Sequence, residues 1–139
     1  MITNERLYKN SKVQLQRLEN ALKKPEDEKL PPKVRKAMRK ALQGQFDAVK
    51  ARLTAYENLS GGNVAEIAVN SLAELALALI QARIARTWTQ KQLAEKLKLP
   101  EQQIQRYEST RYRGAAVERL QEVAAALNVS VQGTVTLNK

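Results

Sequence analysis

The chain has 139 residues, a length that predicts one compact domain or a small domain with an appendage. It contains no cysteine and no histidine, which excludes disulfides, the usual zinc sites and nucleophile–histidine catalysis. We therefore expect neither an enzyme nor a cofactor. Its 24 lysines and arginines against 14 acidic residues favour a polyanionic partner, although a merely solvated basic surface explains them equally well. The polar start and the lack of a long apolar run predict a cytoplasmic protein with no membrane span.

The first part of the chain, residues 1–60, has two helical patterns separated by prolines. In the first, over 11–24, Ser11 and Gln14 have the spacing of an N-terminal capping box. The second, over about 32–59, has apolar residues at steps of three and four. We expect an antiparallel helical hairpin, in which the shorter first helix leaves part of this apolar stripe for another subunit. The whole stripe consists of Val34, Met38, Leu42, Phe46, Val49, Leu53 and Tyr56.

The second part, residues 63–130, follows a Gly-Gly hinge and contains shorter helical patterns. A helix is predicted from Ser71, the first residue of a second capping box, or alternatively from near Asn63, with an apolar face of Leu72, Leu75, Leu79 and Ile80. Thr89 and Gln92 form a third box and predict a helix that begins at Gln90. The next helix begins at Pro100 or Glu101, and a closing helix spans 115–128 with Val117 on its inner face.

A connection of three or four residues is too short for antiparallel packing, so the two short helices are predicted to cross at roughly 90–120°. The second helix then presents an outer face of amide, guanidinium and carboxylate groups. Such groups read base edges in the major groove: glutamine suits adenine, arginine guanine and glutamate cytosine. The candidate base-reading residues are Glu101, Gln102, Gln105 and Arg106. Glu101 is equally well explained as a residue that stabilises the start of the helix.

The stretch "WTQKQLAEKLKLPEQQIQRYES", with "AVERLQEVAAALNVS" after it, resembles the Cro/cI-type (XRE) helix-turn-helix domain of phage and bacterial repressors. The resemblance covers roughly residues 70–130 and implies a lambda-repressor-like helical bundle that binds operator DNA. It also implies phosphate contacts from the residue after the capping threonine and from the loop after the recognition helix. These candidate phosphate-binding residues are Gln90 with its neighbour Lys91, and Arg111, Tyr112 and Arg113.

Two positions depart from the family pattern. Lys98 stands where the family usually has glycine in a left-handed turn, which costs lysine roughly 1 kcal/mol. Pro100 replaces the usual serine or threonine, so a side-chain cap is lost. Glu108 is expected to be structural, paired with Arg83 or Arg86.

Two further segments allow two interpretations each. The basic run of residues 33–40 fits either a solvated helix face or a surface that contacts DNA or an acidic partner. The tail, residues 131–139, fits either a short strand that pairs with its twin in a dimer or an unpaired terminus.

The sequence therefore predicts an all-α, sequence-specific DNA-binding repressor that acts as a homodimer on double-stranded operator DNA. A second hypothesis is an antitoxin, because the N-terminal segment is similar to the extensions of small regulators of that kind. Residues 1–60 would then bind a toxin. A third hypothesis is a nonspecific nucleic-acid-binding protein, which would show a steep salt dependence without sequence preference.

Overall fold

The computed structural model describes residues 1–139 and contains six α-helices and no strand, which confirms the all-α prediction. The chain divides into two compact units, Met1–Gly61 and Gly62–Lys139. No helix combines the length and the apolar character that crossing a bilayer requires.

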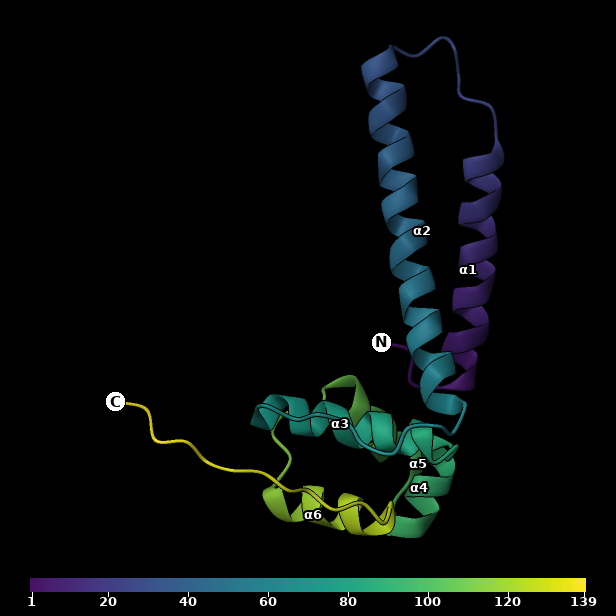
Figure 1. The fold of residues 1–139 in the computed structure, drawn as a ribbon. Coiled ribbons are helices and arrows are strands. Elements are labelled where there is room, and N and C mark those ends of the chain that lie inside the picture. Colours follow the sequence, from purple (N-terminus) through teal and green to yellow (C-terminus); the bar gives the residue numbers. More distant parts are fainter. The chain divides into compact units, whose positions relative to one another are not determined.

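The first unit is a helical hairpin. Helix α1 (Glu5–Lys23) packs against helix α2 (Pro32–Ser60), and the two run antiparallel (Figure 1). Apolar side chains from both helices and from the segment before α1 form the core. Its buried members are Ile2, Leu18, Val49 and Leu53, with Leu7, Tyr8, Leu15, Leu42, Phe46 and Tyr56 partly buried around them.

Helix α1 begins earlier than the sequence predicted. Its N-cap is Asn4, whose side-chain oxygen accepts a hydrogen bond of 2.8 Å from the backbone N–H of Leu7. Glu5 adds a favourable negative charge in the first turn. The proposed cap at Ser11 was therefore wrong: Ser11 lies inside the helix, because Leu7 and Tyr8 extend the buried face toward the N-terminus.

Helix α2 has 29 residues and α1 has 19, so α1 cannot cover the whole apolar stripe of α2. The stripe is packed from Leu42 onward. Closer to the start of α2, Val34 and Met38 keep 41% and 52% of their surface exposed. As predicted, α1 leaves part of the apolar stripe of α2 uncovered, at the end of the hairpin where the two helices are connected.

The second unit contains α3 (Leu72–Ala85), α4 (Gln90–Leu97), α5 (Glu101–Ser109) and α6 (Val117–Ala126). Helix α4 packs on α5 and α6, and α3 packs on α6. The predicted starts of α3, after Ser71, and of α4, after Thr89, are confirmed. The core gathers apolar side chains from all four helices and from the segments that follow α5 and α6: Leu79, Ile80, Ile84, Leu93, Ala94, Ile104, Tyr112, Val123 and Leu127.

Two expectations for this unit need correction. Leu72 and Val117 were assigned to inner faces, but 87% and 67% of their surfaces are exposed. Each is the first residue of its helix and lies beyond the reach of the neighbouring helices. The tail, residues 131–139, is exposed without regular structure in the single chain, so a strand that pairs with its twin in a dimer stays a prediction.

Gly44, inside α2, generates a stability prediction. A Cβ built there meets no atom within 4 Å, so packing within the hairpin does not require glycine. Gly44→Ala should raise the free energy of unfolding of the first unit by about 0.5–1 kcal/mol, because alanine is the better helix former. Urea denaturation followed by circular dichroism measures this change.

The only tryptophan, Trp88, belongs to the second unit and provides the internal control. Its fluorescence transition should be the same in the variant and in the parent protein. A destabilised variant would contradict the prediction, because it would show that α2 needs glycine at this position.

Candidate nucleic-acid interface

The start of α4 is set by a complete capping box. The Thr89 hydroxyl accepts a hydrogen bond of 3.0 Å from the Gln92 N–H, and the Gln92 side chain accepts one of 2.7 Å from the Thr89 N–H. Two otherwise unpaired backbone donors are thereby satisfied. Helix α4 therefore begins at Gln90, and Leu93 and Ala94 face the core.

The connection between α4 and α5 is three residues long. Lys98 adopts the left-handed conformation, with φ 58° and ψ 42°, as its position in the turn predicts. The N–H of Leu99 donates to the Ala94 carbonyl at 2.9 Å, which closes the end of α4. Pro100 is the N-cap of α5 and offers no side-chain cap, also as predicted. A turn this short sends α5 away at a steep angle from α4.

Helix α5 has two distinct faces. Ile104 and Glu108 are buried, whereas the four candidate base-reading residues, Glu101, Gln102, Gln105 and Arg106, are all exposed. Their spacing places them on one side of the helix. None of the four side chains makes a hydrogen bond or an ion pair within the chain, so their polar groups are available to a ligand.

The buried end of α5 is held by an ion pair with α3. Arg83 Nε donates to Glu108 Oε2 at 2.7 Å, and Nη2 donates to Oε1 at 2.8 Å. The two side chains are 3% and 1% exposed. Arg83 Nη1 also donates to the Trp88 carbonyl at 2.6 Å, in the turn that precedes α4. This bidentate pair therefore connects α3, the α3–α4 turn and α5.

Gln90 takes part in the same network. Its side chain is buried, and Nε2 donates to Glu108 Oε1 at 3.0 Å. The sequence assigned Gln90 to phosphate and missed this contact. The signal was available, because Gln90 lies three residues before Leu93 and so shares the inner face of α4, where a polar group needs a partner.

Tyr112 is also placed differently from the expectation. Tyr112 is 4% exposed, and its ring stacks on that of Tyr107 at a centroid distance of 5.4 Å. Burial raises the pKa of its hydroxyl group, with a further contribution from the Glu108 charge. Arg111 and Tyr112 both have left-handed backbone, with φ of 53° and 57°, a conformation that the sequence did not reveal.

The remaining candidate phosphate-binding residues lie on the surface. Lys91, at the start of α4, and Arg111 and Arg113, after α5, are exposed and have no hydrogen bond or ion pair within the chain. The loop with Arg111 and Arg113 is closed by hydrogen bonds from Tyr112 N–H to the Tyr107 carbonyl at 2.6 Å and from Arg113 N–H to the Thr110 carbonyl at 3.1 Å. The loop thereby holds its cations close to the end of α5.

A buttressed short helix, an abrupt turn and a second helix with a free polar face together define a helix-turn-helix DNA-binding unit. Residues 79–133 match the family described as Helix-turn-helix. The second unit therefore carries a helix-turn-helix domain of the Cro/cI type, a DNA-binding domain that acts in the regulation of transcription. No curated protein and no solved structure matches the chain.

The buried ion pair leads to a prediction. Glu108→Gln should destabilise the second unit by about 3–5 kcal/mol, because it leaves the Arg83 charge buried without its counterion. Denaturation followed by the fluorescence of Trp88 measures the loss.

Glu122→Gln is the matched control, since it removes the carboxylate of the exposed Arg119–Glu122 pair and should cost less than about 1 kcal/mol. Equal effects of the two substitutions would show that the buried pair contributes no more than a surface pair.

Proposed function

We propose that the protein is a transcriptional repressor that reads its operator with the exposed face of α5. One observation carries this proposal: Gln102, Gln105 and Arg106 share a solvated face of α5 and have no partner within the chain. A bidentate contact between a glutamine or arginine side chain and the edge of a base discriminates between bases by about 1–3 kcal/mol. Glu101 shares the face and either accepts a hydrogen bond from cytosine or stabilises the start of α5.

The phosphate contacts in this proposal come from Lys91, Arg111 and Arg113. Lys91 lies at the start of α4, and Arg111 and Arg113 follow the end of α5. Contacts of this kind fix the register of the protein on the duplex and carry no sequence information. Gln90 donates to Glu108 and Tyr112 stacks on Tyr107, so in this proposal both residues also hold the interface in position.

The proposal includes a homodimer. Helix α5 has nine residues, so it spans about 13 Å and covers only a few base pairs. At about 1–3 kcal/mol each, three base contacts supply roughly 3–9 kcal/mol, and the weak end of this range falls short of the roughly 4–10 kcal/mol by which specific sites exceed nonspecific ones. Two copies on half-sites about 34–36 Å apart would double the discrimination. Repression would follow from occupation of a promoter.

Selection from a random duplex pool is the first experiment. It should yield a near-palindrome with half-site centres about 10–10.5 base pairs apart. Sedimentation of the complex should then give two chains per duplex. A pool without enrichment would contradict sequence-specific binding and favour the nonspecific alternative.

Two arginine variants separate base reading from phosphate binding on the selected operator. Arg106→Ala should weaken binding by about 1–3 kcal/mol and relax the preference at one base pair per half-site. Arg113→Ala should weaken all sequences alike and make the salt dependence of binding shallower. Fluorescence anisotropy on single-base operator variants, repeated at several salt concentrations, measures both effects.

Arg52→Ala, on the first unit, changes the net charge equally and serves as the control. The assignment of Arg106 as a reader is wrong if its variant loses affinity uniformly over all sequences.

A further inference from the structure

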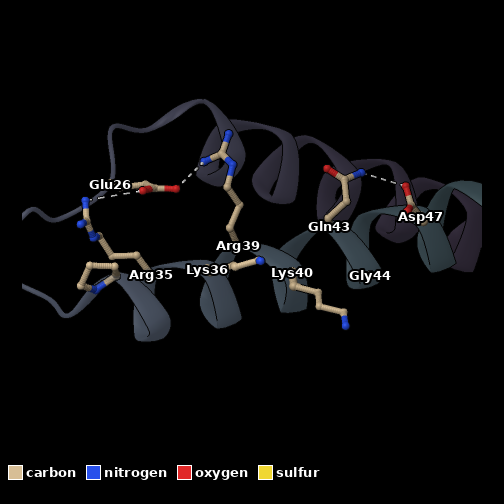
Figure 2. Close-up of a pocket in the computed structure, with 9 residues that line it drawn as sticks. Glu26, Arg35, Lys36, Arg39, Lys40, Gln43, Gly44 and Asp47 are labelled. Carbon is tan, nitrogen blue, oxygen red and sulfur yellow. Dashed lines mark hydrogen bonds and ion pairs between the residues drawn. The ribbon is translucent and has the colours of Figure 1, made fainter.

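The first unit has a basic groove that the proposed function does not use. The groove has a volume of about 670 Å³ and lies along the first half of α2 (Figure 2). Its charged lining consists of Arg35, Lys36, Arg39 and Lys40, with Glu26 and Asp47 as the only acids. We refer to these six residues and the neighbouring Gly44 as the α2 groove.

The two acids of the α2 groove are already engaged. Glu26 lies 3.9 Å from Nη1 of both Arg35 and Arg39, and Asp47 accepts a hydrogen bond of 2.9 Å from Gln43. Lys36 and Lys40 have no acidic partner (Figure 2). Arg35 Nε is shielded from solvent and has no hydrogen-bond acceptor. The α2 groove therefore has an excess of cations whose bonding is incomplete.

The position of Glu26 leaves the bonding of Arg35 and Arg39 incomplete. Its carboxylate lies between two guanidinium groups, but at 3.9 Å both distances exceed hydrogen-bond length. Carboxylates and guanidinium groups bind each other well in a bidentate geometry, which this pair does not reach. Arg35 and Arg39 therefore keep donors for the carboxylate of a ligand beside Glu26.

Gly44 gives an independent indication of a protein ligand. Glycine destabilises the interior of a helix, and the hairpin has no packing need for it. It lines the α2 groove, and the exposed Ala37, Ala41 and Ala48 lie near it on α2. Small side chains allow a second helix to approach the backbone closely, whereas a disordered polyanion gains nothing from them.

A second copy of this chain does not complement the groove. Residues 33–40 include five basic and no acidic side chains, and the whole chain has a formal charge of +10. Packing α2 against its twin would bring like charges together, which is unfavourable by several kcal/mol at an interface. A ligand with the opposite charge fits the same surface.

We propose that the α2 groove docks an acidic helical segment of a partner protein. Lys36 and Lys40 pair with carboxylates of this segment. Arg35 and Arg39 bind a further carboxylate of the segment beside Glu26. Gly44 permits close approach of the partner helix to α2. The interaction is independent of α5, so the protein would hold this partner and DNA on separate units.

Binding of a designed peptide to the full-length protein tests the proposal. The probe is a fluorescent helical peptide of roughly 18 residues, long enough to be partly helical in water, with alanine on one face and glutamate on both flanks. The counterpart peptide has glutamine at each glutamate position. We expect fluorescence anisotropy to show binding of the acidic peptide and not of its counterpart.

Two variants locate the binding surface. The double variant Lys36→Gln/Lys40→Gln should weaken peptide binding about tenfold, the effect of losing two partly exposed ion pairs. The control Lys9→Gln/Arg17→Gln removes the same charge from exposed positions on α1 and should change binding less than about twofold. Gly44→Ala should weaken binding measurably and Gly44→Leu more strongly, because each larger side chain holds the partner helix further from the backbone of α2.

The outcomes are distinguishable. No binding of the acidic peptide, or equal losses in the groove and control variants, would overturn the proposal and leave the lysines as a solvated face. A selective loss of duplex DNA affinity in the groove variant, without an effect on the peptide, would overturn it in favour of a DNA contact. Failure of operator selection would affect the proposed repressor function and not this surface.

Discussion

The ion pair of Arg83 and Glu108 is the constraint on which the geometry of the DNA-binding unit depends. Taking both charges out of water costs several kcal/mol, and only good geometry offsets this cost. The structure provides it: Glu108 accepts hydrogen bonds from Arg83 and Gln90, and Arg83 also donates to the Trp88 carbonyl. Rotation of α5 about its axis would break several of these bonds at once. The pair therefore selects one orientation of α5 more than it adds stability, and this orientation directs Gln105 and Arg106 to the solvent.

The backbone around α5 contains unfavourable conformations that neighbouring packing stabilises. Lys98, Arg111 and Tyr112 are left-handed residues with a Cβ, each at a cost of about 1–2 kcal/mol. Leu93, Ala94 and Ile104 are fully or almost fully buried around the first turn, and Tyr112 is buried in the second. Burial of an aromatic ring of this size contributes about 4 kcal/mol, enough to offset two left-handed residues. The buried tyrosine is thus what keeps Arg111 and Arg113 beside the end of α5.

Local chemistry was predictable from the sequence, and burial was predictable only in part. The Thr89–Gln92 box, the left-handed Lys98 and the exposed face of α5 follow from short-range rules about caps, turns and helix periodicity. The start of α1 was misjudged because Asn4 and Ser11 are both good caps, and only packing of the preceding residues decides between them. Leu72 and Val117 fit the periodicity of their helices, but no other helix reaches them. The burial of Gln90 follows from its position on the inner face of α4, but its partner Glu108 lies 18 residues away, and the burial of Tyr112 depends on a backbone conformation that no local signal reveals.

The arginines of the second unit fall into two groups, those bonded within the unit and those free to bind a ligand. Arg83, Arg86 and Arg119 are bound within the unit: Arg83 to Glu108, Arg86 to the carbonyls of Leu127 and Asn128 at the end of α6, and Arg119 to Glu122. No such partner exists within the chain for three other arginines, Arg106, Arg111 and Arg113. A free arginine retains its hydration and its rotamer freedom, so it adds little to folding, and its five donors remain available to a base or a phosphate. The first unit shows the same division: Arg39 is paired with Glu26, whereas Lys36 and Lys40 have no partner within the chain. Binding capacity in both units thus lies in the cations that the fold positions without neutralising.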